Sequence, residues 1–168
     1  MRYVHAKFWI KNDDNIKTGM QQWLDLVELI QPNDLYSGLT GKIEIRAYKK
    51  EDIDELLEMP FEALKGYRIT IRGKESQIVE IEVSPSLNEV SHLYVCVETT
   101  KQEALCKFIN RFITNNPIMM GWINPAEYNK YYERAYGHLE LGAYWKMYFG
   151  QWAIKYLTEE QFKAIEEI

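Results

Sequence analysis

Alternation of apolar and polar residues marks several strands along the chain. In residues 3–10 the apolar positions are Val4, Ala6, Phe8 and Ile10. Apolar residues at every second position lie on one face of a strand. The same period recurs in residues 43–47, 67–72 and 79–83, and residues 92–97 are almost wholly apolar. These segments predict a sheet of about five strands, with residues 92–97 near its centre.

Residues 67–83 predict a hairpin with charged partners. The turn-forming run 73–76 separates its two strands, and Arg68, Arg72, Glu80 and Glu82 occupy the polar positions. Opposite charges on facing strands stabilise such a pair. We therefore expect the two arginines to neutralise the two glutamates on the solvent side of the hairpin.

Helical periodicity separates these strands. The first helical stripe comprises Ile16, Met20, Trp23, Leu24, Val27 and Ile30. It predicts one helix that ends before Pro32. An acidic segment at 50–59 predicts a short helix ended by Pro60. Thr100 and Glu103 have the spacing of a capping box for a third helix, which closes near Asn115.

The last third of the chain predicts two further helices. Asn124, Pro125 and Glu127 have the order of an N-cap, a first-turn proline and an N3 carboxylate, so a helix is expected over 125–136. Thr158 begins an amphipathic helix that runs to the end of the chain. Gly38 and Gly41 are expected to bracket a turn, and residues 143–149 fit either a strand or a helix.

The chain is expected to form one α+β domain over residues 1–168. Its sheet is antiparallel or mixed, has about five strands and is packed with three to five helices. The 168 residues are 46% hydrophobic, and a chain of this size buries enough surface to fold without a disulfide or a metal. No cofactor is expected.

Charge and hydropathy limit the kinds of partner that this chain is expected to bind. Asp and Glu number 25 against 20 Lys and Arg, a formal net charge of −5. Lys49 and Lys50 form the one basic cluster and run into Glu51 and Asp52, so nucleic-acid binding is disfavoured. The acidic balance suits a protein partner with a basic surface. Lack of a long apolar run or signal-peptide pattern predicts a cytoplasmic protein without membrane contact.

The usual catalytic motifs are missing from the sequence. The three histidines are His5, His92 and His138, and none has the spacing of a zinc site. Cys96 and Cys106 fall in apolar surroundings and are expected to be buried thiols. The sequence therefore offers neither a metal motif nor a nucleophile.

Glu80 and Glu82 leave one enzymatic alternative open. Two carboxylates on one strand face can bind a divalent ion or divide acid and base roles. The alternative function is a small metal-dependent hydrolase or nuclease that uses Glu80, Glu82 and a histidine. Neutralisation by Arg68 and Arg72 is the competing explanation of the pair.

Aromatic residues concentrate near the C-terminus. Between residues 121 and 156, 11 of 36 residues are aromatic, against 14% for the whole chain. A core layer accounts for part of this excess, and exposed Tyr and Trp are typical anchors of protein interfaces. A small-ligand binder for a nucleotide or sugar, with an aromatic pocket, is a further alternative. The candidate partner-binding residues are Trp122, Glu127, Tyr128, Tyr132, Glu133, Tyr136 and Glu140.

The order of several segments resembles a known family. The segments are KFWI, GMQQWLDLVELI, KIEIRAY, GYRITIRG, LYVCVET and AYWKMYFGQW. This pattern is similar to that of immunity proteins of bacterial polymorphic toxin systems. The resemblance implies a stoichiometric inhibitor that binds a cognate toxin, often a nuclease, and blocks its active site. No catalytic residue carries over from the family.

The sequence thus favours a non-enzymatic cytosolic binding protein. It would inhibit a protein partner by covering its functional surface. A phage-type inhibitor of a host defence factor fits the same features, and the sequence does not separate the two.

Overall fold

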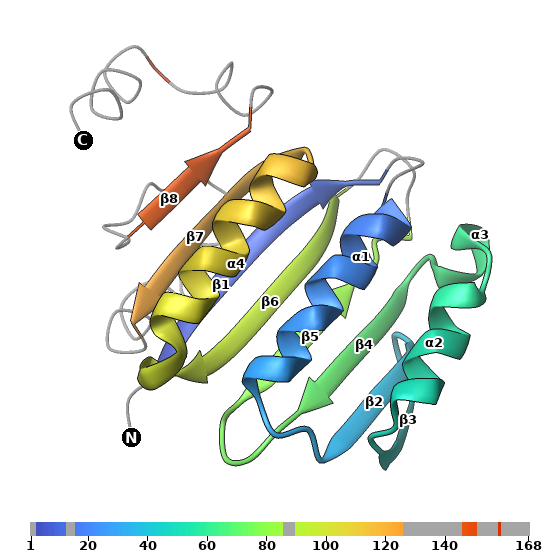
Figure 1. The fold of residues 1–168 in the computed structure, drawn as a ribbon. Coiled ribbons are helices and arrows are strands. Elements are labelled where there is room, and N and C mark those ends of the chain that lie inside the picture. Colours follow the sequence, from blue (N-terminus) through green and yellow to red (C-terminus); the bar gives the residue numbers. More distant parts are fainter. Residues whose placement is uncertain (1–2, 13–15, 86–89, 126–145, 151–157, 159–168) are drawn as a thin grey trace.

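The fold is built on one antiparallel sheet. The computed structural model describes residues 3–12, 16–85, 90–125, 146–150 and 158. The strands are β1 (Tyr3–Lys11), β2 (Asp34–Leu39), β3 (Lys42–Ala47), β4 (Tyr67–Arg72), β5 (Ile78–Glu82), β6 (Val90–Glu98), β7 (Ile118–Pro125) and β8 (Lys146–Phe149). Their order is β3-β2-β4-β5-β6-β1-β7-β8 (Figure 1). The α+β class is confirmed, but eight strands replace the expected five.

The helices of the described part all lie on one face of this sheet (Figure 1). They are α1 (Ile16–Leu24), α2 (Lys50–Glu58), α3 (Phe61–Leu64) and α4 (Gln102–Asn115), with two 3-10 helices, η1 (Asp25–Leu29) and η2 (Thr99–Lys101). None of them is long and apolar enough to cross a membrane. The described part of the chain therefore has two layers, and the sheet face opposite these helices is termed the open face.

The core lies between the sheet and the helices. The side chains of Val4, Ala6 and Phe8 on β1 are fully buried, as the alternation predicts. The Phe8 ring lies 5.8 Å from the ring of Trp23 on α1, which lies 5.2 Å from that of Phe112 on α4. Trp23 Nε1 also donates to the backbone oxygen of Tyr94, at 3.3 Å. These contacts tie both long helices to the middle of the sheet.

Two strands, β2 and β7, were not predicted from the sequence, and the segment of a third, β8, fits either a strand or a helix. β2 contains Gly38, which was expected in a turn; the turn is Thr40–Gly41 instead. A Cβ at Gly38 would lie 2.2 Å from the backbone oxygen of Lys42, and its φ is +151°, so only glycine fits there. β7 ends on Pro125, which was expected to begin a helix. β8 resolves the ambiguous segment 143–149 as a strand at its described residues.

Two helix predictions also need correction. The helix expected over 16–30 divides into α1 and the 3-10 helix η1. The expected capping box is wrong, because Thr100 lies in η2 and its hydroxyl donates to Glu98 at 3.3 Å. Glu103 instead forms an i, i+4 ion pair with Lys107, at 2.7 Å. The acidic helix α2 is confirmed, and the helices expected at 125–136 and 158–168 lie outside the described residues.

Gly121 and Phe8 provide a test of the packing between β1 and β7. The two residues face each other across the strands, and a Cβ on Gly121 would come within 2.1 Å of the Phe8 ring. Gly121→Ala should therefore lower the free energy of unfolding by about 1–3 kcal/mol. In a Phe8→Leu background the same substitution should cost less, because the ring is gone. Urea unfolding of the four variants measures both costs, and equal costs would contradict the contact.

Candidate functional site

The open face presents a continuous set of polar and aromatic side chains. Strand pairing places three rows of residues across it. The rows are Ile43, Gly38, Arg68, Glu82, His92, Trp9, Met120, Phe149; Ile45, Tyr36, Thr70, Glu80, Tyr94, Lys7, Trp122, Met147; and Ala47, Asp34, Arg72, Ile78, Cys96, His5, Asn124. Local alternation thus brings residues from distant segments onto one surface.

Aromatic rings on this face are held by neighbouring strands. Trp9 meets His92 edge-on with 5.8 Å between ring centroids, and the Lys7 ammonium lies 5.0 Å from the Trp9 ring. The Arg72 guanidinium lies 4.5 Å from the ring of Tyr36. All three rings are half-buried. Ring-to-ring and cation–π contacts hold these rings in place while part of each residue stays exposed.

Charges on the open face are paired across the strands. Arg68 donates to Glu82 at 2.7 Å, which confirms the expected salt bridge. Glu80 accepts from the Thr70 hydroxyl at 2.8 Å. The expectation for Arg72 is wrong, because the register places it opposite Ile78 and its guanidinium contacts Tyr36. Arg68 and Glu82 therefore neutralise each other, and Glu80 has a hydroxyl partner.

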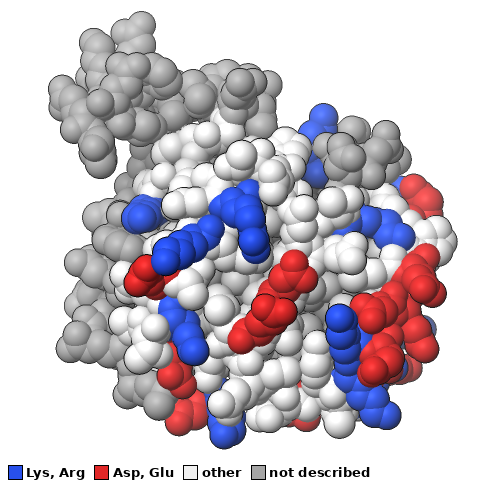
Figure 2. All heavy atoms as spheres, viewed as in Figure 1, with Lys and Arg blue, Asp and Glu red and all other residues white. Residues whose placement is uncertain are grey.

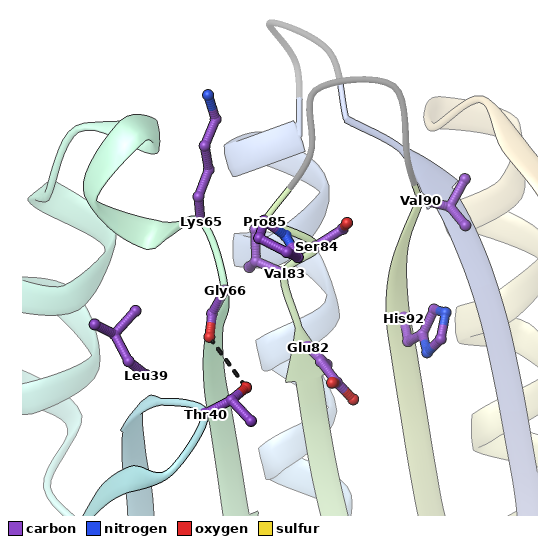
Figure 3. A pocket seen from close by; sticks show the side chains of 10 residues that line it. All are labelled: Leu39, Thr40, Lys65, Gly66, Glu82, Val83, Ser84, Pro85, Val90 and His92. Carbon is purple, nitrogen blue, oxygen red and sulfur yellow. Dashed lines mark hydrogen bonds between the residues drawn. The ribbon is translucent and has the colours of Figure 1, made fainter.

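A cavity of about 470 Å³ lies beside this surface, where β5 and β6 meet the ends of β2 and β4 (Figure 3). Glu82 and His92 line it from neighbouring strands, and Lys65 and Ser84 contribute from its rim. The hydroxyl of Thr40 donates to the backbone oxygen of Gly66 at 3.4 Å across its wall. His92 supplies the one aromatic ring among the residues that line this cavity.

His92 is biased towards its neutral form. Burial lowers the pKa of this imidazole, and the nearby positive charge of Lys7 lowers it further. A neutral imidazole packs against Trp9 without the cost of burying a charge. His5 is placed differently, since its Nδ1 hydrogen-bonds to the hydroxyl of Tyr94 and its Nε2 lies 3.9 Å from the Cys96 sulfur.

The cysteines fit structural roles. Cys96 is buried, as expected, and burial raises the pKa of its thiol to about 11. Such a thiol carries almost no thiolate at neutral pH and is a poor nucleophile. Cys106 is half-buried rather than buried. In the described segments, no group of three or more His, Cys, Asp or Glu residues could hold a metal ion.

Trp122 is the one candidate partner-binding residue in the described part. It lies on β7 opposite Lys7, half-buried on the open face. The other candidates, and His138, lie outside the described residues. Trp9, Tyr36 and Tyr94 were not predicted as surface residues from the sequence; the signal available was their position opposite the buried stripe of each strand.

Acidic residues gather on α2, on the helix-covered side of the molecule (Figure 2). Glu51, Asp54, Glu55 and Glu58 are all exposed there. The acidic members of the candidate partner-binding set, Glu127, Glu133 and Glu140, lie outside the described residues. Trp122, its described member, lies on the opposite, open face of the sheet.

Comparison with known proteins gives a likeness in fold. No family model and no curated protein matches the sequence. Among solved structures the chain is similar to the Pseudomonas aeruginosa T6SS protein PA0821, with a TM-score of 0.58 and 12% sequence identity. The match covers 74% of this chain and 40% of that one. At this identity the likeness concerns the fold alone.

The bias of His92 gives a pH dependence of stability. Its pKa is lower in the folded protein than the ordinary value of 6.5, so the unfolded chain binds the proton more readily. The stabilisation that the neutral His92 imidazole contributes is complete above pH 6.5 and is lost as the pH falls below this value. The melting temperature of His92→Phe should therefore fall less on acidification than that of the wild type. Thermal scans between about pH 7.5 and 5 test this, and equal slopes would contradict it.

Proposed function

We propose that this chain is a non-enzymatic binding protein of the toxin-immunity type, which inhibits a protein partner by covering the partner's functional surface. The observation that carries the proposal is the open face, where half-buried rings from several strands and two arginines of β4 form one surface. Trp, Tyr and Arg are the residues that contribute most to protein interfaces. This face offers all three, in Trp9, Tyr36 and Arg72.

Pre-organisation supports a binding role for this face. Trp9 is held by His92 and Lys7, and Arg72 is held against Tyr36. A side chain that is already ordered loses little conformational entropy when a partner binds. Contacts between these rings and a partner would therefore contribute to affinity with little loss of side-chain entropy.

Charge supports the choice of partner. The net charge is −5 and the exposed carboxylates of α2 are concentrated in two turns of helix. A negative field of this kind raises the association rate with a basic protein more than it raises affinity. We assign recognition to the open face and electrostatic steering to the overall acidity.

The structural likeness fits this proposal at a coarser level. PA0821 is described as a T6SS protein, and a role related to type VI secretion, as effector or immunity protein, is consistent with the shared fold. The pre-organised rings and arginines of the open face favour the immunity role, because they suit a surface that binds and covers a partner. Such a role would be exercised in the cytoplasm. A phage-type inhibitor would use the same face on a host defence factor.

The proposal is tested with paired arginine variants. Arg72 contacts a ring on the open face, and Arg111 makes a comparable contact with Phe108, 5.8 Å from the ring, on the helix side. Trp9→Ala and Arg72→Ala should each raise the Kd for the partner by roughly 30-fold, about 2 kcal/mol. Arg111→Ala should leave it unchanged. The measurement is calorimetry with a purified toxin that the wild-type chain binds.

Growth protection against the same toxin gives the functional readout. Wild type and Arg111→Ala should protect cells, and the Trp9→Ala, Arg72→Ala double variant should not, although its circular dichroism spectrum shows that it is folded. Equal protection by all variants would overturn the assignment to the open face.

One observation favours a second function, hydrolysis. Glu82 and His92 line the same cavity, as the enzymatic alternative requires of a carboxylate and a histidine. The 2.7 Å ion pair with Arg68 argues for a structural carboxylate instead. Glu82→Gln should lower stability by at most about 1 kcal/mol and leave toxin binding intact. Loss of a hydrolytic activity in this variant, with folding retained, would favour the enzyme.

A further inference from the structure

Strand β3 carries the most exposed apolar surface in the described part of the chain. Its residues Ile45 and Ile43 are 65% and 38% exposed. The alternation of this segment predicted a buried stripe, yet both isoleucines lie on the open face at the edge of the sheet. An exposed apolar edge strand of this kind is a template for pairing with a strand of another chain.

The outer backbone of β3 is also ready to pair. Thr40 and Gly41 form a two-residue loop, so Leu39 and Lys42 make the hydrogen-bonded pair beside it. Tyr48 N donates to Asn33 O at 2.9 Å and continues this pattern. Since hydrogen bonds alternate along an antiparallel pair, the even-numbered residues of β3 bond to β2. The backbone groups of the odd-numbered residues point away from the sheet.

We infer that β3 is a homodimer interface, in which two copies pair their β3 strands antiparallel about a two-fold axis at Ile45. This register places Ile45 opposite Ile45 of the second copy and Ile43 opposite Ala47. On the helix-side face it places Glu44 opposite Arg46, twice. Apolar pairs on one face and opposite charges on the other are the contacts that stabilise antiparallel strands.

Neighbouring registers are less favourable. An axis at Glu44 would place Glu44 opposite itself and Lys42 opposite Arg46, so like charges would meet. An axis at Ile43 would leave Ile45 opposite Gly41 of the hairpin loop. The Arg46 side chain is 39% exposed although its Nε lies 3.5 Å from Asp52. It can therefore also reach Glu44 of the second copy.

The dimer would join two eight-stranded sheets into one. A two-fold axis perpendicular to the sheet keeps both open faces on the same side. The assembly would therefore present two copies of the surface assigned to partner binding, side by side. The dimer contact itself does not depend on that assignment.

Charge reversal tests the interface and its register together. The wild type should sediment at twice the monomer mass of 20.0 kDa, with a dissociation constant measurable by dilution. Glu44→Arg should raise this constant at least tenfold, and the double variant Glu44→Arg, Arg46→Glu should restore it. Leu39→Lys is the matched control. Leu39 is 47% exposed on the same hairpin, but it lies on β2 and not on the edge strand. This substitution should therefore leave the dimer dissociation constant unchanged.

Cysteine cross-linking checks the register in chains that stay folded. In a Cys106→Ser background, Ile45→Cys should form a disulfide-linked dimer on mild oxidation, because the two copies of residue 45 face each other at bridging distance. Ile43→Cys alone should not form this disulfide-linked dimer. The double variant Ile43→Cys, Ala47→Cys should form it, because the register pairs residue 43 with residue 47 of the second copy. A monomeric wild type, or a dimer that Glu44→Arg leaves intact, would overturn the proposal, as would cross-linking through residue 43 alone.

Discussion

Strand β1 is the element on which the rest of the structure depends. It pairs with β6 along one side and with β7 along the other, so it joins the two parts of the sheet. Its inward side chains are buried under the helices, and Phe8 contacts Trp23 of α1. Its outward side chains, His5, Lys7 and Trp9, form the middle of the open face. Because the side-chain period of a strand is two, one register determines both the core and the candidate site.

The apolar–polar periodicity of the sequence predicted the strands that have one buried face and one partly exposed face. β1 and the β4–β5 hairpin were found because their inward positions are apolar and their outward positions are not, and β6 was found because its run is almost wholly apolar, as suits a strand inside the sheet. β2 was missed because Asp34, Ser37 and Gly38 have turn-forming character, and the buried environment comes from β3 and β4 on either side. Such tertiary context overrides local preference.

The candidate site was predictable only in part. The Arg68–Glu82 pair followed from two strands that are adjacent in sequence, so its register could be read locally. The meeting of Trp9 with His92 joins strands that are far apart in the sequence and requires the sheet order. Ile43 and Ile45 alternate as a core strand does, yet β3 lies at the edge of the sheet. Alternation specifies a shared face, and the position of a strand in the sheet decides whether that face is covered.

The open face meets two physical requirements at once. The side chains on the face opposite the described helices are mostly half-buried, so they must tolerate water and pack across the strands at the same time. Histidine, tyrosine and tryptophan satisfy both needs, because each has an apolar ring for cross-strand contact and a polar group for water or a neighbour. Tyr94 and His5 use these groups on each other. The same amphipathic rings give up hydration cheaply when a partner covers them, which connects the architecture of the sheet to a binding role.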